Sequence, residues 1–153
     1  MRRLVRCAAF AGAGLLCAAC NSGVPEPASV DVPSAHMRLT VIRAATDPFL
    51  SRHNLTLKVE GAGGCIASTE LFPDTGYAGR RNLYLSVKGH IYIVGQFDAR
   101  VIDPMTCSIV LSEFRHLDRE VVFLGSFDED GERRWTYFPA SVRAERALGT
   151  REN

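Results

Sequence analysis

The histidines and serines of this sequence are the residue types that could carry out acid–base or nucleophilic chemistry. The four histidines are scattered, and no two have the helical or hairpin spacing of a metal or acid–base site. No serine lies in a Gly-x-Ser-x-Gly motif, the turn that exposes the nucleophile of α/β-hydrolases. A Ser-His-Asp arrangement assembled from distant strands stays open, because any chain of this size contains those residues. We therefore predict no catalytic residue and no enzyme. The histidines are His36, His53, His90 and His116.

Two short motifs have residue types that bind ions or phosphates. Residues 61–64 read Gly-Ala-Gly-Gly, but they lack the following Lys-Ser/Thr and the helix N-terminus of a phosphate site. Asp128, Asp130 and Glu132 supply the clustered oxygens that calcium favours. An Asp-Gly pair at a hairpin tip explains the same residues without an ion. We therefore expect two turns and predict no metal and no cofactor.

The segment Phe72–Arg81 is the strongest candidate for a recognition surface. It is a long turn that carries Tyr77 beside Arg80 and Arg81, and these residue types recur at protein-binding hot spots. A plain connecting loop with solvated arginines is the alternative. We name Tyr77, Arg80 and Arg81 as candidate partner-binding residues. Trp135, which follows two further arginines, is expected in the core.

Alternation of apolar and polar residues dominates the chain after Ser34, and this period is typical of strands with one buried face. Turns at Lys88-Gly89 and Asp130-Gly131 predict two hairpins. Seven or eight short strands predict an all-β fold, an antiparallel β-sandwich or a small barrel. Over Ala140–Leu148, a short terminal helix and a last strand with a frayed tail both stay open. The residues expected to face inward are Met37, Leu39, Val41, Leu55, Leu57, Val59, Leu83, Leu85, Val87, Ile91, Ile93, Gly95, Phe97, Cys107, Ile109, Leu111, Val121, Phe123, Gly125, Phe127, Trp135 and Tyr137.

Residues 1–19 have the three parts of a secretory signal peptide. A basic stretch, Met1–Arg6, precedes the apolar run Ala8–Leu16 and the small pair Ala18-Ala19. The apolar run is short for a bilayer core of about 30 Å, which needs roughly 20 helical residues. An uncleaved membrane helix is therefore the weaker interpretation, and we predict cleavage after Ala19.

The sequence Leu16-Cys17-Ala18-Ala19-Cys20 resembles the lipobox of bacterial lipoproteins. The resemblance covers only this leader, and it departs from the usual pattern because Cys17 stands where the family normally has leucine. It implies that Cys20 receives fatty acyl groups such as palmitate and becomes the new N-terminus. Since Asn21, and not Asp, follows, the resemblance favours the outer membrane. The alternative is ordinary secretion with Cys20 as a free thiol.

If Cys7 and Cys17 leave with the leader and Cys20 carries the lipid, only Cys65 and Cys107 remain. An exported chain meets an oxidising compartment, where such a pair forms a disulfide. Closing a loop of about 42 residues would stabilise the fold by roughly 4 kcal/mol. We predict a structural disulfide; two free thiols or a two-ligand metal site are the alternatives.

Residues 20–34 contain Pro25, Pro27 and Pro33 and show no apolar periodicity. Such a segment is expected to stay extended and solvated, as a lipidated N-terminus and tether spanning up to roughly 40 Å. The predicted organisation is therefore a signal peptide over 1–19, a tether over 20–34, a β domain over 35–148 and a tail over 149–153.

Charge argues against nucleic acid as a partner. Removing Arg2, Arg3 and Arg6 from the 18 basic residues leaves 15 against 17 acidic residues, a mature net charge of −2. Nucleic-acid binding needs a basic face. We predict a membrane-anchored, non-enzymatic binding or assembly module that faces the periplasm, with the membrane and an envelope protein as partners. Exposure at the cell surface is the alternative orientation. A small-ligand or carbohydrate-binding lipoprotein is the alternative, and a hydrolase a weaker third.

Overall fold

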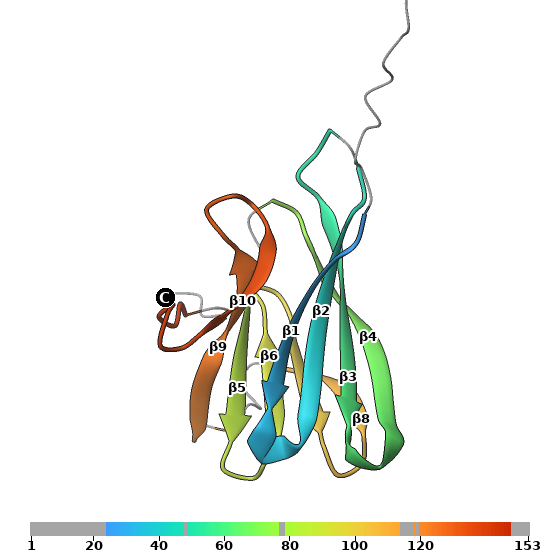
Figure 1. Ribbon diagram of the computed structural model, residues 1–153, viewed down its shortest axis with the longest axis vertical. Coiled ribbons are helices and arrows are strands. Elements are labelled where there is room, and N and C mark those ends of the chain that lie inside the picture. Colours follow the sequence, from blue (N-terminus) through green and yellow to red (C-terminus); the bar gives the residue numbers. More distant parts are fainter. Residues whose placement is uncertain (1–23, 48, 77–78, 114–117, 119, 148–153) are drawn as a thin grey trace, which may run out of the picture.

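In the part of the chain that the structure describes, ten strands form two antiparallel sheets that pack face to face (Figure 1). This computed structural model describes residues 24–47, 49–76, 79–113, 118 and 120–147. The two sheets share no ladder, so the predicted all-β fold is confirmed as an antiparallel sandwich and not a closed barrel. Within these ranges there is no α-helix, and no helix long and apolar enough to cross a membrane.

The first sheet contains four strands in chain order, each paired with the next. Alternate residues of β2 and β3 face the second sheet and are buried. The turn before β4 contains Gly63 and Gly64 with φ of 72° and 82°, so residues 61–64 form the expected turn. The strands are β1 (Glu26–Val32), β2 (Met37–Ala45), β3 (His53–Gly61) and β4 (Cys65–Asp74).

The second sheet has the order β10-β9-β5-β6-β7-β8. Its middle strands follow one another through hairpins, and the chain then returns so that β9 pairs with β5, as in a Greek key. Both predicted hairpins are confirmed. Gly89 takes the positive φ in the first, whereas Arg133, not Gly131, takes it in the second. The strands are β5 (Arg81–Ser86), β6 (Ile91–Val94), β7 (Ala99–Asp103), β8 (Ser108–Ser112), β9 (Val121–Glu129) and β10 (Trp135–Pro139).

The predicted disulfide is confirmed, and it joins the two sheets. Cys65 begins β4 of the first sheet, and Cys107 ends the turn before β8 of the second, with their Cα atoms 5.6 Å apart. β4 and β8 lie beside each other along this edge of the sandwich, while β1 lies beside β10 along the other. The bridge therefore holds one of the two seams closed.

Side chains from both sheets make one core, much as the alternation predicts. Leu39, Leu57, Leu83 and Phe127 are fully buried there, and Trp135 is buried as expected. The prediction is wrong for three residues that are exposed, Val87, Phe97 and Leu111. It is also wrong for Val121 and Phe123, which lie on the outer face of β9, because the pairing of β5 with β9 shifts register after Leu83. Val87 and Phe97 lie beyond the ends of β5 and β6, and Leu111 lies near the end of the edge strand β8. Alternation ceases to report burial where a strand ends and where the pairing of two strands shifts register.

The predicted tether over residues 20–34 is wrong for its second half. Residues 26–32 form β1, which pairs with β2 from Glu26 opposite Arg43 to Val32 opposite Met37. Ala28 and Val32 are buried in the core. Pro27 is tolerated because β1 is an edge strand, whose outer amides need no ladder partner. The β domain therefore begins near residue 26, not residue 35.

The terminal helix considered for Ala140–Leu148 does not form over its described part, residues 140–147. A turn follows β10, and residues 144–147 are irregular. Side chains from the start of β5 bind the carbonyl groups of this segment: Arg80 donates to Ala144 O, and Asn82 to Arg146 O, both at 2.7 Å. Leu148 and the predicted tail over 149–153 lie outside the described residues.

Candidate functional site

Arg43 is a charged residue at an inward-facing position of β2. It continues the buried series Met37, Leu39 and Val41, and its side chain is almost fully buried. A buried guanidinium is costly unless it is paired and hydrogen-bonded. The alternation of β2 could have flagged this residue, because a charge at an inward position needs a partner inside the fold. No prediction from the sequence named Arg43.

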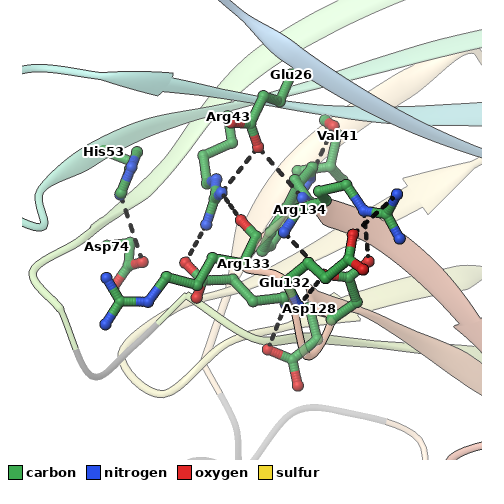
Figure 2. Close-up of polar contacts among 12 residues, drawn as sticks. Glu26, Val41, Arg43, His53, Asp74, Asp128, Glu132, Arg133 and Arg134 are labelled. Carbon is green, nitrogen blue, oxygen red and sulfur yellow. Dashed lines mark hydrogen bonds and ion pairs between the residues drawn. The ribbon is translucent and has the colours of Figure 1, made fainter. Parts of the chain in front are cut away.

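The partners of Arg43 come from both sheets (Figure 2). Nη2 donates to Glu26 Oε2 and to Arg133 O, each at 2.8 Å. Nη1 donates to Glu129 Oε1, and the guanidinium also lies over the Trp135 ring. Two carboxylates, a carbonyl oxygen and an indole thus surround one cation.

Trp135 completes this cluster from the other side. Its backbone N–H donates to Glu26 Oε2 at 3.2 Å, and its Nε1 donates to Val41 O at 3.0 Å. Both hydrogen bonds run from β10 to the first sheet. The cluster therefore joins β1 and β2 of the first sheet to β9 and β10 of the second.

Arg81, named as a partner-binding residue, lies inside the protein. It is 1% exposed, and it donates to Arg80 O at 3.0 Å and to Phe72 O. Asp98 Oδ1 lies 3.7 Å from Nη2. Burial lowers the pKa of Arg81, against the opposing effect of Asp98 and Asp74. The expectation of a surface arginine is wrong, since this cation ties the end of β4 to the turn after β6.

Arg80 is also buried, at 8% exposure. Its Nε donates to Asn82 Oδ1 at 3.0 Å, and its Nη2 reaches the C-terminal segment. Burial is the largest cause of its lowered pKa. Neither arginine can present its guanidinium to a partner without leaving these contacts. Tyr77, the third named residue, and Cys20 lie outside the described residues.

The C-terminal segment covers one part of the outer face of β5. Tyr84 OH donates to Glu145 Oε1 at 2.8 Å and accepts from Asn82 Nδ2 at 2.9 Å. Burial and the hydrogen bond to Glu145 raise the pKa of Tyr84. These contacts, together with those of Arg80, make the segment part of the fold.

His53 and Asp74 are the described pair that most resembles acid–base machinery. They face each other from the start of β3 and the end of β4 (Figure 2), with Nδ1 and Oδ2 3.8 Å apart. This separation exceeds a hydrogen bond, and Nδ1 of His53 has no hydrogen-bond partner in the described part of the chain. Asp74 Oδ1 instead accepts from Gly76 N at 2.8 Å. Asp74 thus shapes a turn.

The acidic residues of the β9–β10 hairpin are bound to nearby arginines and amides. Asp128 Oδ2 accepts from Arg143 at 2.7 Å. Asp130 accepts from the backbone N–H of Glu132 and of Arg134, and these bonds lower its pKa, the Arg134 amide most strongly. In the ranges that the structure describes, no three His, Cys, Asp or Glu side chains gather as metal ligands would.

The other two described histidines sit in turns. His36 has a left-handed backbone, with φ of 50°, in the β1–β2 turn. It borders a shallow, open depression with Met37 and the exposed ion pair Arg38–Asp31, whose closest atoms are 3.5 Å apart. His90 N donates to Ser86 Oγ in the β5–β6 hairpin. His116 lies outside the described residues.

Comparison of the chain with protein-family models, curated proteins and solved structures finds no match. The described polar groups form three structural centres: the Arg43 cluster, the Arg81 cluster and the Arg80–C-terminal contacts.

Proposed function

We propose that the mature chain is a lipid-anchored, non-enzymatic module of the bacterial cell envelope. It is held in the outer membrane by acyl groups on Cys20 and faces the periplasm, where it binds or braces another envelope component. The observation that carries this proposal is the sequence Leu16-Cys17-Ala18-Ala19-Cys20 behind a basic and apolar leader.

The disulfide supports export of the domain. Cys65 and Cys107 are bonded, and a structural disulfide of this kind persists in oxidising compartments such as the periplasm. Cys20 is then the one cysteine left unpaired after removal of Cys7 and Cys17. Acylation would protect that thiol from oxidation.

The two buried arginines bind groups of the fold itself, and this supports a binding or bracing role over catalysis. Arg43 and Arg81 carry their charges into the interior, and each binds carbonyl oxygens and carboxylates of the fold itself. A catalytic group needs a nucleophile or base directed at a space where substrate fits. The guanidinium groups of Arg43 and Arg81 are instead bound by groups of the fold.

Serine substitutions at Cys20 and Cys17 test the anchor with a matched control. The Cys20→Ser variant should lose incorporation of labelled palmitate and move to the soluble periplasmic fraction. The Cys17→Ser variant should keep both the label and membrane fractionation, because it leaves the acylated residue intact. Intact-mass analysis of the parent should show acyl groups on the mature N-terminus. An unacylated parent, or a Cys20→Ser variant that stays in membranes, contradicts the proposal.

A further inference from the structure

The start of β1 and the β2–β3 loop lie at the same end of the sandwich. Glu26 pairs with Arg43, and β2 ends two residues later at Ala45, where the loop begins. Figure 1 shows the loop projecting beyond the other connections at this end. We call this end of the sandwich the tether end, because the chain leading to Cys20 enters the domain here.

Two adjacent apolar side chains are exposed on this loop. Phe49 is 92% exposed and Leu50 is 51% exposed. The backbone beneath them is already hydrogen-bonded: Asp47 Oδ1 accepts from Phe49 N at 2.7 Å and from Leu50 N at 3.1 Å. Backbone N–H groups that are satisfied internally can approach lipid without an unpaired polar group. The loop therefore presents an apolar tip with part of its polar backbone covered.

The corrected domain boundary places this tip close to the proposed anchor. Only five residues lie between Cys20 and Glu26, and the six Cα–Cα steps that join these two residues span at most about 20 Å. A tether reaching to Ser34 would have allowed twice that distance. The short tether instead keeps the tether end beside the membrane that holds the lipid.

We propose that Phe49 and Leu50 enter the interface of the membrane that holds the Cys20 lipid, so that the domain stands on its tether end. This inference rests on the proposed lipid anchor and adds an orientation to it. Aromatic and aliphatic side chains partition favourably into that interface. Because the anchor makes the contact intramolecular, two side chains suffice where a free domain would need a larger apolar surface.

Charges of both signs lie at the tether end: Asp47 on the loop and Glu132 on the β9–β10 hairpin are acidic, and two neighbouring arginines are basic. Arg52 is exposed on the loop itself, and Arg133 is exposed on the neighbouring β9–β10 hairpin. Arg133 lies at this end because its carbonyl accepts from Arg43, the partner of Glu26. Basic side chains near the surface are attracted to anionic headgroups.

The test places an indole at each end of the full-length, acylated protein. Phe49→Trp puts it on the tip, and Met105→Trp puts it in the β7–β8 turn at the other end, where Met105 is 95% exposed. The proteins are reconstituted in vesicles of phosphatidylethanolamine and phosphatidylglycerol, with and without brominated acyl chains. The emission of Trp135, buried in both variants, is subtracted using the parent protein.

The indole introduced by Phe49→Trp should shift to shorter wavelength on reconstitution and lose most of its emission to brominated lipid. The indole introduced by Met105→Trp should show neither change. Equal, solvent-like emission from both variants overturns the membrane contact. Vesicle flotation separates this result from failure of the anchor: a protein that floats while both indoles stay unquenched is anchored but not oriented, whereas a parent that does not float refutes the proposed function.

Discussion

The guanidinium of Arg43 lies 5.4 Å from the centre of the Trp135 ring, so a cation of the first sheet packs on an aromatic side chain of the second. The same guanidinium binds Glu26 and Glu129. Cation–π contact, ion pairing and the indole hydrogen bond to Val41 O therefore act at one point of the inter-sheet seam.

Arg43→Ala should destabilise the protein by about 3 kcal/mol, because it leaves Glu26, Glu129 and the carbonyl of Arg133 without their cation. This value is at the low end for a buried pair, since both carboxylates are more than a third exposed. Chemical denaturation measures the change. Arg38→Ala is the control: its pair with Asp31 is exposed on both sides, so its loss should cost less than about 1 kcal/mol. Equal losses of stability in the two variants would show that the contacts of Arg43 do not hold the two sheets together.

Gly95→Ala should destabilise the fold through Arg81. A Cβ at this position would lie 2.7 Å from Cζ of the buried guanidinium, so Arg81 must shift away from its carbonyl and carboxylate partners. Overpacking of this kind costs about 1–3 kcal/mol.

Gly131→Ala is the matched control for Gly95→Ala, because no atom lies within 4 Å of its added methyl group and its φ is not positive. Its thermal midpoint should stay near that of the parent, within the change expected for about 0.5 kcal/mol. A Gly95→Ala variant as stable as the control would mean that Arg81 can be displaced without cost.

Much of this fold follows from the sequence because alternation reports which side of a strand is buried. Leu39, Leu57 and Leu83 behave in this way. β1 was missed because Pro27 within it, with Pro25 and Pro33 beside it, resembles the composition of a solvated spacer. Ala28, Val30 and Val32 nevertheless occupy alternate, inward positions of this strand. β4 and β7 were missed too. Most inward residues of β4 are small or polar, so its contrast with the outer face is weak, and β7 is only five residues long.

The charged clusters could not be derived in the same way. Arg81 is buried beside Asp98, which comes from the turn after β6, and Arg43 pairs with Glu129 from a strand 86 residues away. An arginine near a turn is indistinguishable from a surface residue until the carboxylate that folds onto it is known. The position of the tether end could not be predicted either, because it depends on β1. This strand shortens the segment between Cys20 and the domain.

Reduction of the disulfide should lower stability by roughly 4 kcal/mol, given the 42-residue separation of Cys65 and Cys107. The double variant Cys65→Ser/Cys107→Ser should match the reduced parent in denaturant midpoint, and reductant should leave that variant unchanged. Because β4 and β8 meet along this seam, hydrogen exchange should accelerate there first. Uniform acceleration over both seams would indicate that the bridge acts only on the unfolded chain.

Acid should weaken the β9–β10 hairpin through Asp130. Hydrogen bonds from Arg134 and Glu132 lower the pKa of this carboxyl below its ordinary value of 3.8. A group with a lowered folded-state pKa stabilises the fold above its unfolded pKa, and that stabilisation disappears as the pH falls through the folded value. The urea midpoint of the parent should therefore decline below about pH 4, and Asp130→Asn should flatten this decline because its amide does not titrate.

At pH 7 the Asp130→Asn variant should be less stable than the parent, since a neutral acceptor binds the Arg134 guanidinium and two amides more weakly. Parallel pH profiles for the two proteins would assign the acid sensitivity to other carboxylates, with Asp118 and Asp103, whose pKa values are also lowered, the next to substitute.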